Sequence, residues 1–281
     1  MDHESDQATR AVLEPRHPVG SPEGELPPGG DDPIMPGDHF IIDLDGTLLR
    51  GGVATEGGQA FLRGVEGRFV LVSNNSRDVS PSLSAKLRRV GLDIPAERMV
   101  LAGEETIGFV ASRFPGARCL IAASPTLRHH ARRQGLAPVT ERADVVVLGR
   151  DTSWSYAKLM LLANEVCRGA VLIAANPDLT HPGNDGLIVP ETGSLLAAVE
   201  AASGVGATHV IGKPAATLFV AALERLGSAR HDTIVIGDNP LTDRAGARAL
   251  GLRSLIVDAD RLGGQPNLAD LCDRLAPINS A

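Results

Sequence analysis

The sequence has few cysteines, few aromatic residues and no long apolar segment. Its three cysteines are widely spaced and form no C-x-x-C pair, so we expect reduced, buried thiols rather than disulfides. Although 43% of the residues are hydrophobic, no uninterrupted apolar run approaches the ~18 residues of a membrane-spanning helix. The first six residues contain neither a basic nor an apolar region, so we expect no secretory signal and a cytoplasmic protein.

The folded part of the chain also lacks an excess of positive charge. The net charge of −7 lies entirely in residues 1–38, which contain nine acidic and two basic residues. The remaining residues contain 25 of each sign, so we expect neither a nucleic-acid partner nor a membrane partner. Residues 1–38 are rich in proline, glycine and acid and contain no aromatic residue, which predicts a disordered acidic leader.

Beyond the leader, short apolar runs alternate with helix-like segments. Fully apolar runs of this length are typical of strands buried on both faces, and the alternation predicts βαβ units in a parallel sheet, and hence an α/β fold. The pattern restarts near Pro115, which indicates a second small α/β domain inserted into the first. We expect a Rossmann-like core at residues 39–114 and 204–281 and the inserted domain at residues 115–203.

Two carboxylates follow the first apolar run directly. Asp43 and Asp45 are two residues apart on extended backbone, so their side chains point to the same side of the strand. Carboxylates this close repel each other unless a cation or a proton lies between them. A surface turn, a calcium loop and phosphoryl-transfer chemistry are the three readings of this motif. A calcium loop, however, needs further oxygen ligands and a closing Glu, which the next residues do not supply.

Three other predicted strand ends carry polar groups that suit the third reading. They are the segment Ser73–Asn75, the residue Lys213, and the pair Asp238 and Asp243. Each alone is an ordinary surface feature, such as a capping loop, a solvated lysine or a Gly-Asp turn. The carboxyl ends of parallel strands line one crevice, so we expect all four groups to meet there.

These stretches resemble the four motifs of the haloacid dehalogenase (HAD) superfamily. The matching segments are D-x-D-G-T-L at Asp43–Leu48, S-N-N-S at Ser73–Ser76, G-K-P at Gly212–Pro214 and G-D-x-x-x-T-D at Gly237–Asp243. The long insertion between the second and third motifs resembles subclass IIA, the phosphatases with an α/β cap. Two more stretches typical of that subclass are Asn176–Asp178 and Thr192–Leu195. The resemblance extends over roughly residues 39–260 and implies a HAD core with an inserted cap domain.

The resemblance implies a Mg²⁺-dependent phosphatase that hydrolyses a phosphomonoester of a small metabolite through an aspartyl-phosphate intermediate. Asp43 would be the nucleophile, and it needs no deprotonation at neutral pH. Asp45 would protonate the leaving oxygen and later activate water. Lys213 would neutralise charge between Asp43 and the phosphate.

The resemblance also implies which residues bind the phosphate and the metal. The donors expected to contact the phosphoryl oxygens are Ser73, Asn74 and Asn75. The expected ligands of Mg²⁺ are the carboxylates of Asp43 and Asp238 and the backbone carbonyl of Asp45. Asp243 would orient these ligands indirectly.

The inserted domain gives fewer indications of substrate. His181 lies in a stretch that resembles the cap loop of pyridoxal phosphate and phosphoglycolate phosphatases, where the histidine contacts the organic part of the substrate. A surface loop histidine fits the sequence as well. Glu191 stands where Gly is usual in the P-x-T-G-S stretch, a departure that bears on the cap hinge. We expect Trp154 and Tyr156 to pack on a cap helix, and the resemblance implies a homodimer formed through the caps.

Two other functions use the same residues. A phosphotransferase would pass the phosphoryl group to an acceptor alcohol instead of water. A non-catalytic relative would only bind a phosphorylated metabolite; the loss of Asp45 or Lys213 would favour it, but both are present. A dinucleotide-binding enzyme is disfavoured because no G-x-G-x-x-G follows the first strand.

Overall fold

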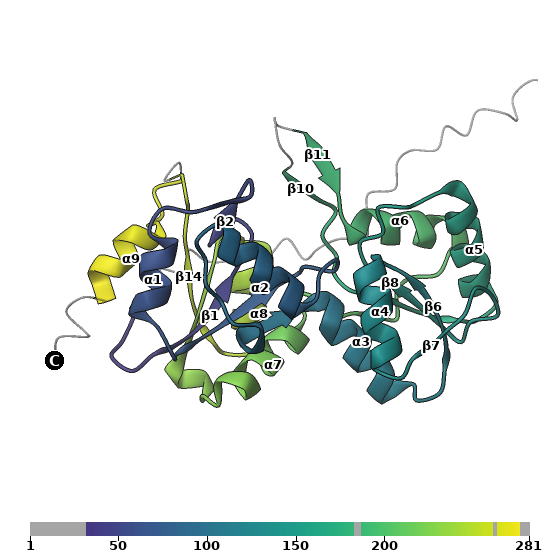
Figure 1. Cartoon of the computed structure of the whole chain (residues 1–281), viewed down its shortest axis with the longest axis horizontal. Helices are drawn as coiled ribbons and strands as arrows, with labels where there is room; N and C mark the ends of the chain where they lie inside the picture. Colours follow the sequence, from purple (N-terminus) through teal and green to yellow (C-terminus); the bar gives the residue numbers. More distant parts are fainter. Residues whose placement is uncertain (1–31, 183–186, 261–262, 276–281) are drawn as a thin grey trace, which may run out of the picture. The chain divides into compact units, whose positions relative to one another are not determined.

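The computed structural model describes residues 32–182, 187–260 and 263–275, and these residues contain two five-stranded parallel sheets (Figure 1). The first sheet has the order β14-β13-β1-β4-β5. Its strands are β1 (His39–Asp43), β4 (Phe69–Ser73), β5 (Met99–Leu101), β13 (Thr233–Gly237) and β14 (Arg253–Ile256). The strand β1 is central, so its carboxyl end adjoins those of β4 and β13. The predicted α/β fold is confirmed.

Helices cover both faces of the first sheet, which is why its strands are apolar throughout. Phe40 and Ile42 of β1 pack in one buried cluster with α1, α2 and α9, whereas Ile41 lies in a second cluster with α3, α7 and α8. The helices are α1 (Gly58–Gly64), α2 (Ser80–Arg89), α3 (Ala102–Arg113), α7 (Ala216–Leu226), α8 (Ala245–Ala249) and α9 (Leu268–Leu275). This packing from both sides fixes the position of the strand end that carries Asp43.

The second sheet has the order β12-β9-β8-β6-β7. Its strands are β6 (Arg118–Ala122), β7 (Ala137–Pro138), β8 (Val145–Leu148), β9 (Val171–Ala174) and β12 (His209–Val210), and its helices are α4 (Pro125–Arg133), α5 (Tyr156–Cys167) and α6 (Thr192–Ser203). The strand β12 pairs with β9, although our boundary at residue 203 assigned it to the core segment. The sequence run was correct as a strand, but an apolar run does not reveal which sheet it joins.

Two short antiparallel hairpins were not anticipated from the sequence. One consists of β2 (Leu49–Arg50) and β3 (Val53–Ala54), and the other of β10 (Thr180–Pro182) and β11 (Ile188–Pro190). Strands of two or three residues are too short to show an alternating pattern, so apolar periodicity gives no signal for them. Both hairpins carry residues that border the candidate site described below.

The last residues of the expected disordered leader, residues 32–38, form contacts with the first sheet. Residues 1–31 lie outside the described residues, but residues 32–38 contact β14. The amide of Ser254 donates to Oδ2 of Asp32 at 2.9 Å, and the guanidinium of Arg253 pairs with the buried carboxylate of Asp38. These acids were counted with the leader because of its composition, whereas they form specific contacts with the sheet.

The structure also tests the sequence predictions about the cysteines, about Trp154 and Tyr156, and about membrane-spanning helices. All three cysteines are free thiols as expected, but Cys167 is exposed rather than buried. Trp154 packs against the core of the second sheet, whereas Tyr156 is 83% exposed and does not pack as we predicted, because it is the first residue of α5 and the buried residues of that helix lie further along, at positions 162–166. Among the described residues, no helix is both long and apolar enough to cross a membrane.

Candidate active site

The candidate site begins at the carboxyl end of β1, where Asp43 is the last residue of the strand and is buried. The chain then turns at Gly46, whose φ of +90° lies in the left-handed region that favours glycine. A side chain at Gly46 would also overlap the carboxylate of Asp238. Glycine is therefore required here both for the turn and for the close approach of the first and fourth motifs.

Lys213 contacts the first and fourth motifs directly. Its side chain is only 4% exposed, and Nζ donates to Oδ1 of Asp43 at 2.5 Å and to Oδ1 of Asp243 at 2.6 Å. Burial alone would lower the pKa of Lys213, but the carboxylates of Asp243 and Asp43 raise it well above its usual value. Lys213 is therefore a permanent cation that holds one oxygen of Asp43 in a fixed position.

Three carboxylates beside this lysine could hold a metal ion. Ligand oxygens of Asp43, Asp238 and Asp243 all lie within 4.8 Å of one another. Burial raises the pKa of Asp43 despite the opposing effect of Lys213. Burial and the neighbouring Asp243 raise the pKa of Asp238 to about 6. Negative charge is therefore costly here, and a divalent cation with oxygen ligands would relieve that cost, so the residues fit Mg²⁺.

The contacts of Asp243 already use both of its carboxylate oxygens. Oδ1 accepts from Lys213 at 2.6 Å and Oδ2 accepts from the amide of Asn239 at 3.2 Å. Asp238 has no such pairing with Lys213, and its carboxylate faces the cavity. Asp43 and Asp238 are therefore the carboxylates best placed to bind a metal, with Asp243 orienting Lys213.

Asp45 lies next to Asp43 without sharing its lysine. Oδ2 of Asp45 accepts from the hydroxyl of Ser73 at a long 3.5 Å, and the side chain lines the cavity. The surrounding protein raises the pKa of Asp45 by burial, although Lys213 opposes this shift. A carboxyl group with a raised pKa is suited to proton transfer, whereas Asp43 is held as an oriented nucleophile.

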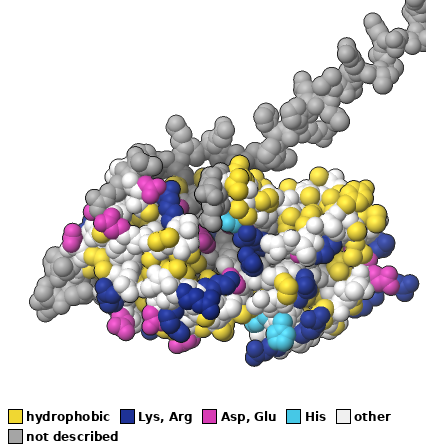
Figure 2. Space-filling view, turned by 45° about the horizontal axis from the view of Figure 1, so that its top comes forward, with side chains coloured by type: hydrophobic (Ala, Val, Ile, Leu, Met, Phe, Trp, Pro, Cys, Tyr) yellow, Lys and Arg dark blue, Asp and Glu magenta, His cyan; other side chains and the backbone are white. Residues whose placement is uncertain are grey.

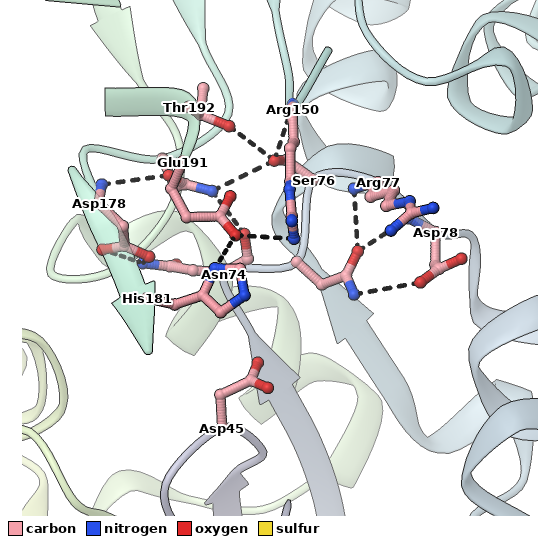
Figure 3. A network of polar contacts seen from close by, with 12 residues as sticks. Asp45, Asn74, Ser76, Arg77, Asp78, Arg150, Asp178, His181, Glu191 and Thr192 are labelled. Atoms are coloured by element: carbon pink, nitrogen blue, oxygen red, sulfur yellow. Dashed lines mark hydrogen bonds and ion pairs between the residues drawn. The ribbon is translucent and has the colours of Figure 1, made fainter. Parts of the chain in front are cut away.

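The two asparagines of the second motif point in different directions, one into the cavity and the other towards the loop that follows β4. Asn74 lines the cavity. Its side-chain oxygen accepts from the backbone N–H of Lys213 at 2.7 Å, and its side-chain NH₂ group donates to the backbone carbonyl of Lys213 at 3.2 Å. The side-chain oxygen of Asn75 instead accepts from the amides of Arg77 and Asp78 at 2.9 and 2.8 Å (Figure 3). The side chain of Asn75 therefore holds the loop and does not line the cavity.

Asn176, Asp178 and Thr192 complete the site through contacts with the second motif. Asn74 donates to both oxygens of Asp178 at 3.0 and 3.2 Å, and the hydroxyls of Ser76 and Thr192 lie 2.7 Å apart (Figure 3). The amide of Asn176 donates to the Asn74 carbonyl at 2.6 Å. Sequence reasoning noted these stretches as typical of the subclass but did not identify Asp178 as a cavity residue.

His181 lies on β10 and lines the same cavity. Its Nδ1 is 2.7 Å from Oε1 of Glu191, and the guanidinium of Arg150 is 2.9 Å from the same oxygen. Arg150 and Asp151 follow the strand β8, and that position made them further candidates for substrate contact in the sequence. The pairing of Arg150 with Glu191 was not predicted, because the two residues are distant in the chain. Glu191 was noted only as a departure from Gly.

These residues enclose a cavity of about 660 Å³, a size typical of small-molecule sites. The predicted residues that line it are Asp43, Asp45, Asn74, His181, Lys213, Asp238 and Asp243. Ser73 is buried directly beneath, where its hydroxyl accepts from the amide of Asn75 at 3.0 Å. Loops far apart in the sequence thus meet at the carboxyl ends of β1, β4 and β13.

Comparison with known proteins relates most of the chain to hydrolases, among them phosphatases. Residues 40–137 match the family described as haloacid dehalogenase-like hydrolase, and residues 210–266 match the family described as HAD-hydrolase-like. A dihydroxyacetone phosphatase of Corynebacterium glutamicum is 31% identical over 221 residues, which are 78% of this chain and 80% of that protein.

Solved structures of two phosphatases have a similar fold. The p-nitrophenyl phosphatase from Archaeoglobus fulgidus has a TM-score of 0.76 at 26% identity, covering 84% of this chain and 98% of that one. The glycerol phosphate phosphatase from Mycobacterium tuberculosis in complex with magnesium has a TM-score of 0.74 at 34% identity, covering 82% and 70% of the two chains.

Proposed function

The chain belongs to the haloacid dehalogenase-like hydrolases of subclass IIA, and on that premise we propose that it is a Mg²⁺-dependent phosphatase that hydrolyses a phosphomonoester of a small metabolite through an aspartyl-phosphate. The observation that carries this proposal is the 2.5 Å contact between Lys213 and Asp43, in a cavity that Asp45 and Asp238 also line. The relatives named above act, by their names, on small phosphate esters, which supports this class of substrate.

In this mechanism Asp43 attacks the phosphorus atom, and the bond between phosphorus and the leaving oxygen breaks. Asp45 donates its proton to that oxygen and then accepts a proton from water, which attacks the aspartyl-phosphate and releases inorganic phosphate. The raised pKa of Asp45, caused by burial, favours the protonated form that the first step requires. Lys213 holds Asp43 in position and balances the charge that develops on the phosphoryl oxygens.

The carboxylates of Asp43 and Asp238 and the backbone carbonyl of Asp45 would hold the metal ion. When bound, Mg²⁺ neutralises charge on the phosphoryl group and orients it for in-line attack. The cluster of three carboxylates and the raised pKa values of Asp43 and Asp238 support this assignment, since a cation offsets the cost of burying these acids together.

We assign the hydrogen-bond donors to the phosphoryl oxygens to the second motif, as the sequence predicted, but its three residues contribute unequally. The side chain of Asn74 faces the cavity, and Ser73 lies beneath it. The side chain of Asn75 is engaged with Arg77 and Asp78 and its backbone amide donates to the Ser73 hydroxyl, so we assign Asn75 the smallest part. We further propose that residues 39–114 and 204–281 form the catalytic core and 115–203 the cap, except that β12, at residues 209–210, joins the sheet of the cap.

Replacing the proposed nucleophile tests this function. We expect Asp43→Asn to reduce Mg²⁺-dependent release of phosphate from p-nitrophenyl phosphate by at least about 10³-fold, because no carboxylate remains to attack. Asp93→Asn is the matched control, since Asp93 is exposed and pairs only with Arg88 on the surface. Near-normal turnover by a folded Asp43→Asn protein would contradict the assignment.

A further inference from the structure

Glu191 makes an unusual set of contacts for its position. It is the residue that precedes α6, where an acidic side chain commonly accepts from the free amides of the first turn, yet it makes no such bond. Its Oε1 instead lies 2.9 Å from the guanidinium of Arg150 and 2.7 Å from the Nδ1 of His181 (Figure 3). One carboxylate oxygen thus lies within ion-pair distance of both side chains.

This cluster lies at the end of the cavity where the leaving group must lie. In-line attack by Asp43 places the leaving oxygen on the opposite side of the phosphorus, near the acid Asp45. The ring of His181 lines the cavity and lies between Glu191 and Asp45 in Figure 3. Glu191 is 15% exposed and lies behind His181, outside the set of residues that line the cavity.

Each permanent cation near the substrate already has a carboxylate partner. Among the described residues that line the cavity, these cations are Lys213 and Arg50. Lys213 binds two aspartates, as described above, and Arg50 lies 2.8 Å from Asp260. Behind the cavity wall Arg150 is neutralised by Glu191. Asp178 adds a further carboxylate to the lining.

We propose that Glu191 is a positioning residue that restricts the substrate to phosphate esters whose leaving group carries no second negative charge. By pairing with Arg150, it removes the net positive charge that would hold a carboxylate or second phosphate at this end, and it also contacts His181. Among the described residues that line the cavity, a second anion would face Asp178 and would meet no unpaired cation, which costs free energy in a partly buried site. This inference rests on the proposed phosphatase function, since it concerns the substrate of that site.

Two esters of equal length test the proposal. In 2-phosphoglycolate the carbon next to the ester methylene is a carboxylate, whereas in 2-hydroxyethyl phosphate it is a hydroxymethyl group. We expect the wild-type protein with Mg²⁺ to favour 2-hydroxyethyl phosphate in kcat/KM by at least about tenfold, because an uncompensated charge at this range has an effect of that order.

Variants of Glu191 and Arg150 should shift the ratio of kcat/KM for 2-hydroxyethyl phosphate to that for 2-phosphoglycolate in opposite directions. Glu191→Gln leaves Arg150 uncompensated, so the preference should fall at least about fivefold, through a lower KM for 2-phosphoglycolate with kcat nearly unchanged. Arg150→Gln leaves the negative charge of Glu191 without its arginine partner, so the preference for 2-hydroxyethyl phosphate over 2-phosphoglycolate should rise. Partial unfolding cannot produce shifts of opposite sign. Glu191→Asp, which keeps the charge, should retain the preference for 2-hydroxyethyl phosphate.

Glu141→Gln is the matched control, because Glu141 is exposed in the same half of the chain and its replacement changes the net charge equally. Its ratio should equal that of the wild type. A wild-type preference for 2-phosphoglycolate, or an equal change for both esters in Glu191→Gln, would overturn the inference while leaving the phosphatase function intact. Failure of the wild type to hydrolyse p-nitrophenyl phosphate with Mg²⁺ would instead refute the proposed function, and this inference with it.

Discussion

The charged form of Asp238 lowers the stability of the metal-free protein, although the proposed metal site requires it. Burial and the nearby Asp243 raise its pKa to about 6, so at neutral pH its charged form is unfavourable in the folded protein. For an acid whose pKa is raised on folding, stability decreases as the pH rises from its unfolded-state pKa to its folded-state pKa. A bound divalent cation would reverse this penalty.

Removing this carboxylate should therefore separate stability from metal binding. Without a divalent metal at pH 7, we expect Asp238→Asn to be at least as stable as the wild type. Saturating Mg²⁺ should raise the melting temperature of the wild type only, since a ligand at about 100 times its Kd contributes about 2.7 kcal/mol. Differential scanning fluorimetry with Mg²⁺ and with EDTA measures both effects. Asp232→Asn, at an exposed site, should behave as the wild type, and an undiminished Mg²⁺ shift in Asp238→Asn would contradict this account.

At the residue level, spacing predicted the position of some groups but not the direction of their side chains. The i, i+2 spacing of Asp43 and Asp45 was sufficient to bring them to one site. Lys213 lines the same cavity, but it follows β12 of the second sheet, so the expectation of strand ends from a single sheet does not account for its position. Asn75 follows the same strand as Asn74, yet its side chain turns back to the amides of Arg77 and Asp78. A local alternative of this kind depends on the backbone conformation of the loop, which the sequence does not reveal.

At the scale of elements, Glu165 joins α5 to the segment that leads into β8. Its carboxylate is buried and accepts from the amides of Arg142 and Ala143, both at 3.0 Å, and from the guanidinium of Arg168 at 2.7 Å. Burial raises the pKa of Glu165, but the combined effect of these hydrogen bonds and of Arg168 is larger and lowers the pKa below its ordinary value of 4.5. The ionised form of Glu165 therefore stabilises the second sheet and its helix.

Glu165→Gln should destabilise the protein by about 1–3 kcal/mol at pH 7, because two partly buried amides lose a charged acceptor. For a carboxyl whose pKa is lowered on folding, this contribution is present above pH 4.5 and is lost as the pH falls through the folded-state pKa. Urea unfolding at several pH values should show the difference from the wild type decreasing towards acid pH. The exposed Glu141→Gln provides the control, and a difference that is constant with pH would refute this role.

The elements that the sequence predicted are those with enough residues to show a pattern. The apolar runs of β1, β4 and β13 and the helices that follow them were identified from alternation alone. The two hairpins are too short for that signal, and β12 was assigned to the wrong sheet because pairing depends on distant residues. The hairpin β10–β11 matters most, since it carries His181.

At the scale of the whole molecule, the resemblance to subclass IIA predicts a homodimer through the cap, which stays a prediction. Helix α5 exposes Tyr156 and Met160, which are 83% and 55% accessible. Figure 2 shows hydrophobic side chains gathered on the right of the view, where α5 and α6 lie in Figure 1. Large exposed apolar side chains that lie together are typical of contact surfaces between proteins.

We therefore expect a dimer in light scattering after size-exclusion chromatography, and we expect Tyr156→Glu to give a monomer, since a charge placed in the interface must be desolvated. Met35→Glu changes an exposed apolar residue far from α5 in the sequence and should leave the dimer intact. A wild-type protein that is monomeric at all concentrations would contradict the prediction, and so would a dimer unaffected by Tyr156→Glu.

The account as a whole depends on covalent chemistry at Asp43, which trapping the intermediate tests most directly. Because p-nitrophenolate leaves without a proton, Asp45→Asn should still form the aspartyl-phosphate but hydrolyse it slowly. Reactions of this variant with p-nitrophenyl phosphate and Mg²⁺ are quenched in acid, reduced with borohydride, digested and analysed by mass spectrometry. The account predicts conversion of Asp43 to homoserine. An unmodified Asp43 in a sample that releases p-nitrophenol, or modification of another residue, would contradict it.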